Sequence, residues 1–154
     1  MTRIYLVQHG EAASKDVDPD RPLTPKGVRD ITVMARFLKN SGVQLADILH
    51  SGKLRAEQTA GIFAQAFLDS ATTGIVRDIN PNDSVQAFTG RLDQYSTGSM
   101  FVGHLPFMEK LAAYLVCGSE VLPLVRFTPG SVLCLAAVKG VWVIEWMIRP
   151  ELIP

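Results

Sequence analysis

The chain of 154 residues lacks the features that mark a disulfide scaffold or a nucleic-acid binder. Its two cysteines, Cys117 and Cys134, stand among apolar neighbours and form no Cys-x-x-Cys pair. This usage predicts buried free thiols in a reducing compartment, and it offers neither a zinc ribbon nor a redox pair. The formal net charge is +0 and basic residues form no run. No nucleic acid is therefore expected as a partner.

Long uninterrupted apolar stretches are also missing. The stretch before Gln8 is too short for a secretion signal, and Lys139-Gly140 interrupts the longest apolar run, 131–148, which also contains Glu145. We interpret that run as two strands joined by a tight turn rather than as a membrane span. With 47% hydrophobic residues, the chain has the length and composition of one domain, residues 1–154, with a real core. We expect a cytoplasmic protein with no membrane partner.

The pattern of apolar residues predicts strands that alternate with helices and a β-rich end. The predicted strands are 3–7, 46–50, 74–77, 99–102, 125–128, 131–138 and 141–148. The predicted helices are 25–40, with Thr24 as its N-cap, 54–68, 83–95, with Asp83 as its N-cap, and 107–116. This order is typical of an α/β fold: a three-layer α/β/α domain with a mostly parallel mixed sheet.

Chemistry-bearing residues follow three of the predicted strands. His9 and His104 each end a strand beside a glycine, and Arg55 opens the helix after the strand that ends at His50. Because carboxyl ends of parallel strands meet at one sheet edge, these side chains are expected to gather there. Gly10 has no Cβ, so a tetrahedral anion could approach the backbone beside His9. Cationic donors beside helix N-termini are typical of a phosphate site.

Two histidines also suggest phosphoryl transfer. One ring nitrogen could attack phosphorus, and the second ring could donate a hydrogen bond to the phosphoryl oxygens. No carboxylates stand at metal-ligand spacing, so neither a metal nor another cofactor is expected. Taken singly, the same residues have structural interpretations: His9 as a strand cap, His104 as a turn residue, and Arg55 as a partner of Glu57 or Gln58. We interpret His50 as structural.

Four motifs make the sequence resemble the histidine phosphatase superfamily, and within it the short SixA-type phosphohistidine phosphatases. They cover nearly the whole chain, in the family's order and at matching spacing. The matching segments are Leu6-Val7-Gln8-His9-Gly10-Glu11, Arg21-Pro22-Leu23-Thr24-Pro25-Lys26-Gly27, Ser51-Gly52-Lys53-Leu54-Arg55-Ala56-Glu57-Gln58-Thr59 and Val102-Gly103-His104-Leu105-Pro106.

The resemblance implies a phosphoglycerate mutase-like fold and roles for particular residues. His9 would be the nucleophile that becomes phosphorylated, with Arg55 and His104 holding the phosphoryl oxygens. Gln8, Gly10 and Arg21 would contact phosphate or substrate. A phosphate or sulfate ion is expected in the pocket. Larger relatives carry an inserted segment with an acidic proton donor, for which this chain has little room. An open pocket suits a phosphohistidine-bearing signalling protein as partner, because imidazole leaves without a strong general acid.

One position departs from the family pattern, because Gln8 stands where the family has an arginine before the nucleophile. Glutamine offers a neutral amide in place of a permanent charge and a fork of donors. Losing one transition-state donor typically slows a reaction about a hundred- to a thousandfold. We therefore expect a slow, metal-independent phosphohistidine phosphatase. The alternatives are a phosphomonoesterase for a small metabolite and a pseudo-phosphatase that binds phosphoproteins without cleaving them.

Overall fold

The sheet of this protein has six strands in the order β3-β2-β4-β1-β5-β6, seen in a computed structural model that describes residues 1–67 and 72–154. Four of the strands are parallel: β1 (Thr2–Gln8), β2 (Asp47–His50), β3 (Thr72–Ile75) and β4 (Ser99–Gly103). Two more continue the sheet in antiparallel pairs, β5 (Val132–Val138) and β6 (Val141–Ile148). The carboxyl ends of β1, β2 and β4 consequently share one edge.

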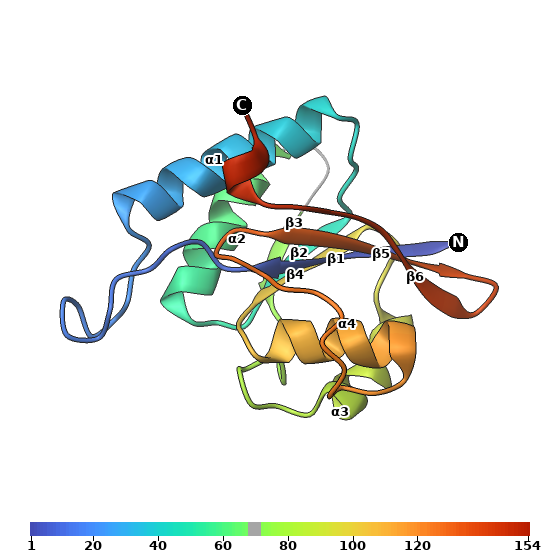
Figure 1. Cartoon of the computed structure of the whole chain (residues 1–154). Coiled ribbons are helices and arrows are strands. Elements are labelled where there is room, and N and C mark those ends of the chain that lie inside the picture. The colour runs from blue at the N-terminus through green and yellow to red at the C-terminus, as the bar shows by residue number, and fades with distance from the viewer. Residues whose placement is uncertain (68–71) are drawn as a thin grey trace.

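Helices cover both faces of this sheet (Figure 1). The helices α1 (Pro25–Asn40) and α2 (Leu54–Ala66) pack on one face, and α3 (Val85–Thr89) and α4 (Phe107–Cys117) pack on the other. The expected three-layer α/β/α fold with a mixed sheet is thus confirmed. Short 3₁₀ turns, Leu92–Gln94 and Pro150–Leu152, follow α3 and β6. The end of α2 that the sequence predicts, at Leu68, lies outside the described residues.

The central strand β1 is buried on both faces. Ile4 and Leu6 belong to the core beneath α3 and α4, whereas Tyr5 and Val7 belong to the core beneath α1 and α2. All four are at most 4% exposed. Alternation along a strand sends successive side chains to opposite faces, so β1 contributes to both cores at once. This position fixes the residues that follow β1 firmly against the rest of the fold.

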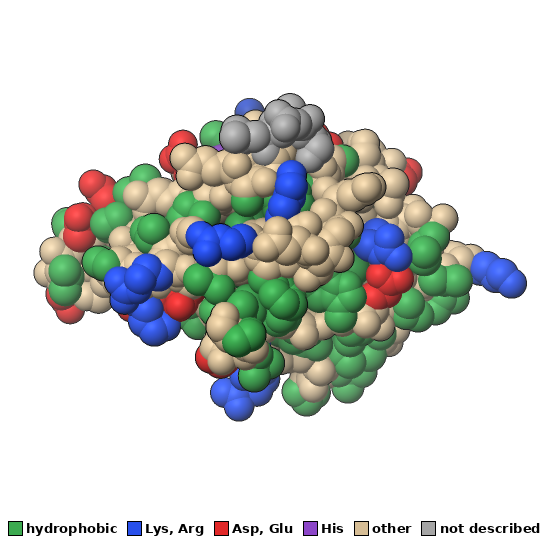
Figure 2. Space-filling model, turned by 90° about the horizontal axis from the view of Figure 1, so that it is seen from above, with side chains coloured by type: hydrophobic (Ala, Val, Ile, Leu, Met, Phe, Trp, Pro, Cys, Tyr) green, Lys and Arg blue, Asp and Glu red, His purple; other side chains and the backbone are tan. Residues whose placement is uncertain are grey.

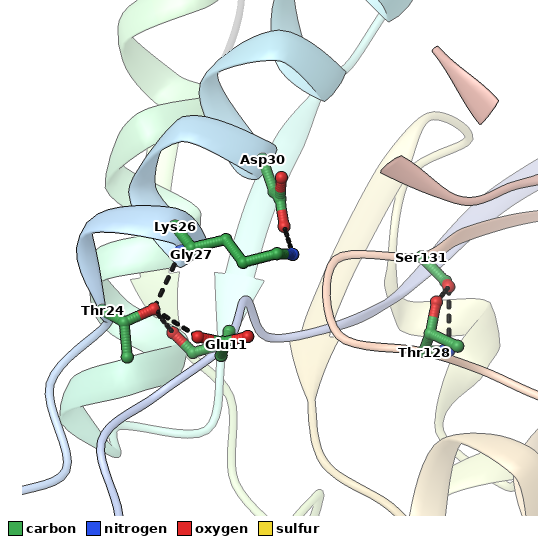
Figure 3. A network of polar contacts seen from close by, with 7 residues as sticks. All are labelled: Glu11, Thr24, Lys26, Gly27, Asp30, Thr128 and Ser131. Carbon is green, nitrogen blue, oxygen red and sulfur yellow. Dashed lines mark hydrogen bonds and ion pairs between the residues drawn. The ribbon is translucent and has the colours of Figure 1, made fainter. Parts of the chain in front are cut away.

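The N-terminus of α1 is tied to the loop after β1 (Figure 3). The hydroxyl of Thr24 accepts from the Gly27 amide at 3.0 Å and donates to the Glu11 carboxylate at 2.9 Å. Thr24 is thereby confirmed as the N-cap, with Pro25 as the first residue of the helix. A Cβ at Gly27 would collide with the carbonyl oxygen of Glu11, which requires glycine there. The loop that carries the first histidine is therefore held against α1.

The prediction of one helix over residues 83–95 is wrong. The structure has the five-residue α3 and then a separate 3₁₀ turn. Ser84, not Asp83, caps α3 by accepting from the Ala87 amide, while the Asp83 carboxylate accepts from the Asn80 amide. Gly90 ends the helix. Local capping and a glycine therefore divide a segment whose periodicity was too weak to fix its length.

The prediction of a strand over 125–128 is also wrong. That segment is irregular in the structure. Side chains rather than a neighbouring strand take up its amides. The Phe127 amide donates to the Glu109 carboxylate at 2.9 Å. The Thr128 amide donates to the hydroxyl of Ser131, also at 2.9 Å (Figure 3). Strand β5 already pairs with β1 and β6, so it has no free edge for a further strand. Strand β3 begins and ends two residues before the predicted range 74–77.

The hairpin at the end of the chain is confirmed. Val138 pairs with Val141, and Lys139 and Gly140 both have positive φ values, 52° and 79°. Such a two-residue turn suits the twist of the strands it joins. The prediction of two buried thiols holds for Cys134 and is wrong for Cys117, which is exposed at the end of α4.

Figure 2 shows the molecule from above, where Lys and Arg side chains are scattered over the face among hydrophobic, acidic and uncharged groups. Within residues 1–67 and 72–154, no helix has the length and hydrophobicity needed to cross a membrane.

Candidate active site

Two strand ends and one helix start converge at the carboxyl edge of the sheet. His9 follows β1, His104 follows β4, and Arg55 lies in the first turn of α2, which begins shortly after β2 ends. The two imidazole rings are 5.1 Å apart between centroids, and Arg55 Nε lies 3.3 Å from His9 Nε2. The structure therefore brings together the three side chains that the sequence selects.

The hydrogen bonds of His9 define its tautomer. Its Nδ1 lies 2.7 Å from the carbonyl oxygen of Gly10. A carbonyl can only accept, so Nδ1 carries the proton and Nε2 carries the lone pair. Arg55 Nε donates to that Nε2. The ring nitrogen that faces Arg55 is thus the nucleophilic one.

Burial keeps His9 neutral. The residue is 9% exposed, and loss of hydration lowers its pKa from the ordinary 6.5 to about 4. The positive charges of Arg55 and Arg21 lower that pKa further, against the opposing effect of the Gly10 hydrogen bond. At neutral pH the lone pair on Nε2 is therefore available for attack on an electrophile.

His104 is the second buried ring of the site, 2% exposed. Its Nε2 lies 2.6 Å from the hydroxyl oxygen of Ser51. Its Nδ1 is buried and has no hydrogen-bond partner among the described residues. Burial first, and then the nearby charges of His9, Arg55, Lys53 and Arg21, lower the pKa of His104 to about 3. The surroundings of this ring are consequently suited to an anion, which would favour its protonated form.

Ser51 and Thr59 are site residues that the sequence reasoning quoted without giving them a role. Thr59 is fully buried; its hydroxyl accepts from the Gly10 amide at 3.0 Å and donates to the Arg55 carbonyl at 2.8 Å. One side chain thus joins the loop of His9 to the helix of Arg55. Ser51 and Thr59 belong to the same motif as Arg55, and this membership is the feature of the sequence that could have identified them as site residues.

Arg21 reaches the site from a loop that folds back on itself. Residues Ala12 and Leu23 form an isolated antiparallel bridge, and Arg21 Nε donates to the Ala13 carbonyl at 3.0 Å. The charge of Arg21 contributes to the lowered pKa values of His9, His104 and Arg55. Arg21 is therefore within electrostatic range of all three, as a substrate-contacting role requires.

Gly10 and Gln8 flank His9 and have different surroundings. The Gly10 amide is engaged by Thr59, and a Cβ on Gly10 would lie 2.9 Å from Ile31 Cγ1, so this glycine permits close packing against α1. The side-chain oxygen of Gln8 is buried and accepts no hydrogen bond among the described residues. Contacts of Gly10 and Gln8 with substrate remain predictions.

Two carboxylates that follow His9 in the sequence have hydrogen-bond partners in the loop after β1 and at the start of α1. Glu11 accepts from Thr24, and Asp18 accepts from the Asp20 amide at 2.9 Å. Among residues 1–67 and 72–154, no carboxylate contributes to the pKa shift of His9 or His104. In the part of the chain that the structure describes, no three His, Cys, Asp or Glu side chains are grouped as a metal site would require. Two histidines and nearby cations make up the chemistry of the site.

The chain is similar to known proteins in sequence and in fold. A model of the histidine phosphatase superfamily (branch 1) matches residues 4–80. An uncharacterised protein of Picosynechococcus sp. (strain ATCC 27264 / PCC 7002 / PR-6) is 33% identical over 75% of this chain and 73% of the relative. The phosphohistidine phosphatase SixA of Escherichia coli (strain K12) is 28% identical over 96% of this chain and 94% of the relative. A solved structure of the protein histidine phosphatase SixA complexed with tungstate has 25% identity, covers 99% of both chains and gives a TM-score of 0.86.

Proposed function

This chain belongs to the histidine phosphatase superfamily, and we propose that it is a metal-independent phosphohistidine phosphatase that acts on a phosphorylated protein. The observation that carries the proposal is the His9 ring, with its lone pair on Nε2, its proton on Nδ1 and Arg55 Nε at 3.3 Å. A nucleophile beside a guanidinium is suited to a phosphoryl group, whose oxygens a guanidinium binds.

The proposed reaction has two displacements. In the first, His9 Nε2 attacks phosphorus; a bond forms between them while the bond from phosphorus to the substrate imidazole breaks, and its electron pair leaves on that imidazole. Arg55 turns its donors from Nε2 to the phosphoryl oxygens, and His104 donates to them. In the second, water attacks the phosphorus on His9, its proton ends on the released orthophosphate, and the electron pair returns to Nε2.

The Gly10 carbonyl supports the intermediate. A ring phosphorylated on Nε2 while Nδ1 keeps its proton is cationic, and the 2.7 Å contact with the Gly10 oxygen stabilises that charge. A cationic imidazole is in turn a good leaving group for the second displacement. The hydrogen bond to Gly10 therefore selects the His9 tautomer before the attack on phosphorus. It also assists breakage of the bond between Nε2 and phosphorus in the second displacement.

The charges around the two rings favour a particular leaving group. Arg55, Lys53 and Arg21 act on His104, and no carboxylate in the described part of the chain does. A sugar or alkyl phosphate needs a general acid to protonate its departing oxygen, whereas a protonated imidazole leaves without one. This difference supports phosphohistidine over a small-metabolite phosphomonoester. The tungstate in the related SixA structure, a tetrahedral oxyanion, supports phosphate or sulfate binding in this pocket.

Gln8 favours a second candidate, a pseudo-phosphatase that binds phosphohistidine proteins without turnover. A neutral amide at this position leaves one charged donor fewer on the transition state than an arginine would. In the first proposal the same feature makes the enzyme slow. The partner in either case is a signalling protein that carries phosphohistidine.

Phosphate release from a phosphohistidine protein, compared with release from p-nitrophenyl phosphate, tests the function. We expect release from the phosphoprotein by the wild type, none by His9→Ala, and no change when a chelator is added. Preference for small phosphate esters would favour the phosphomonoesterase. Binding of the phosphoprotein without release would identify a pseudo-phosphatase, and activity lost to chelator and restored by metal would contradict the mechanism.

A further inference from the structure

Among the described residues, three cations act on the pKa values of His9 or His104, and Lys53 is the one without a role in the sequence motifs or the proposed mechanism. It immediately precedes α2, and its side chain is exposed. None of the ion pairs found among the described residues includes it. Arg21, by comparison, already donates through Nε to the Ala13 carbonyl. The ammonium of Lys53 therefore keeps all of its donors for a ligand.

The turn that carries Lys53 is fixed to His104. The Gly52 amide donates to His50 Nδ1 at 3.1 Å, and the Lys53 amide donates to the hydroxyl oxygen of Ser51 at 3.4 Å. That oxygen also lies 2.6 Å from His104 Nε2. Gly52 has a φ of 91°, which permits the tight turn. Through Ser51, the backbone of Lys53 is thus held to the second histidine of the site.

The pKa of His104 agrees with a position of Lys53 beside that ring. The charge of Lys53 contributes to the lowered pKa of His104, so the ammonium lies within electrostatic range of that ring. Gln8 is uncharged, and its buried side-chain oxygen is an acceptor, which a phosphoryl oxygen cannot use. A dianion at this site therefore meets positive charge from α2 and the turn before it, and none from position 8.

We propose that Lys53 binds the phosphoryl group beside Arg55 and supplies the second cation that Gln8 does not provide. This inference rests on the proposed function and deepens it, because it assigns phosphate binding to a residue of the third matching segment that has no role in the resemblance. An ammonium on a flexible stem is a point charge rather than a bidentate fork. Compared with an arginine at position 8, Lys53 would therefore replace the attraction for the dianion. It would replace less of the oriented hydrogen bonding to the transition state.

Sulfate binding tests the assignment without requiring turnover. Calorimetry at low ionic strength would measure the sulfate affinity of four proteins: the wild type, Lys53→Ala, Lys53→Arg and Lys39→Ala. We expect about a tenfold loss in Lys53→Ala, the usual size for one charge-assisted contact. Lys53→Arg should keep most of the affinity. Lys39→Ala is the control: this exposed lysine lies in the last turn of α1, 5.2 Å from the centre of the Phe67 ring, so its removal should leave sulfate affinity unchanged.

A double-variant cycle with Gln8→Arg separates charge replacement from a general effect. If Lys53 replaces the missing charge, Gln8→Arg should restore sulfate affinity in Lys53→Ala and raise it much less in the wild type. Equal effects of Lys53→Ala in both backgrounds, or wild-type affinity in Lys53→Ala, would overturn the proposal. Absence of turnover by the wild type on every phosphorylated substrate would instead remove the proposed phosphatase function and leave the sulfate result standing.

Discussion

Ser51 and His104 are separated by 53 positions in the chain, and the hydroxyl oxygen of Ser51 lies 2.6 Å from Nε2 of His104. The other ring nitrogen of His104 has no hydrogen-bond partner among the described residues. Ser51 is thus the side chain that fixes the orientation of this ring beside His9. We regard Ser51 as a positioning residue.

Ser51→Ala should lower kcat about tenfold, because in the proposed mechanism His104 donates to the phosphoryl oxygens and the variant removes the contact that orients its ring. Ser51→Thr keeps the hydroxyl and should recover part of the loss. Thermal unfolding should change little in either variant, and single-turnover kinetics would measure the chemical step. An unchanged kcat in Ser51→Ala would show that the contact does not position the ring.

Thr59→Val should destabilise the fold by about 1 to 3 kcal/mol, because it leaves the buried Gly10 amide without its acceptor. Urea unfolding would measure the change. Thr89→Val provides the matched control: the hydroxyl of Thr89 is buried with no hydrogen-bond partner among the described residues, so its removal should be neutral or stabilising. Equal losses in the two variants would mean that the Thr59 bridge contributes nothing.

The stability of the folded protein should fall as the pH drops from about 6.5 toward 4. His9 has a pKa of about 4 in the fold against 6.5 ordinarily. Between those values the unfolded chain binds a proton that the folded chain does not, which favours unfolding. Urea unfolding of wild type and His9→Asn at several pH values would isolate this contribution, because other groups are common to both. Parallel stability curves for the two proteins would contradict the lowered pKa.

Gln8→Arg should speed the phosphoryl-transfer step, because the arginine adds a charged donor beside the nucleophile. The gain should be at most about a thousandfold and smaller if Lys53 already supplies part of the charge. The counter-hypothesis is that Arg21 has replaced the missing cation, in which case a further arginine would be repelled. Single-turnover rates of wild type, Gln8→Arg, Arg21→Ala and the double variant would decide. A wild type as fast as arginine-bearing relatives, with no gain in Gln8→Arg, would contradict slow turnover.

The sequence predicted most clearly the elements whose signals are local. Thr24 and Pro25 mark the start of α1, and Lys139-Gly140 marks a hairpin turn, because capping and positive φ depend on the residues themselves. The segment 125–128 has the composition of a strand. Its amides are nevertheless taken by side chains of Glu109 and Ser131, a choice that only the folded chain reveals.

The candidate site shows the same division. The predicted topology places the motif residues that follow the strands at one edge of the sheet. It therefore predicts that His9, Arg55 and His104 lie close together, as they do in the structure. The links that orient them could not be predicted. Thr59 joins Gly10 to Arg55, and Ser51 contacts His104, through side-chain directions that depend on the packing of α2 against the loop after β1.

Trapping the phosphoenzyme tests the central claim most directly. Wild-type protein would be exposed briefly to a phosphohistidine protein, quenched in alkali, digested and searched for phosphopeptides. We predict acid-labile phosphate on the peptide that contains His9, and no labelled enzyme in His9→Ala. Label confined to the peptide of His104, or turnover by His9→Ala at the wild-type rate, would contradict the assignment of His9 as the nucleophile.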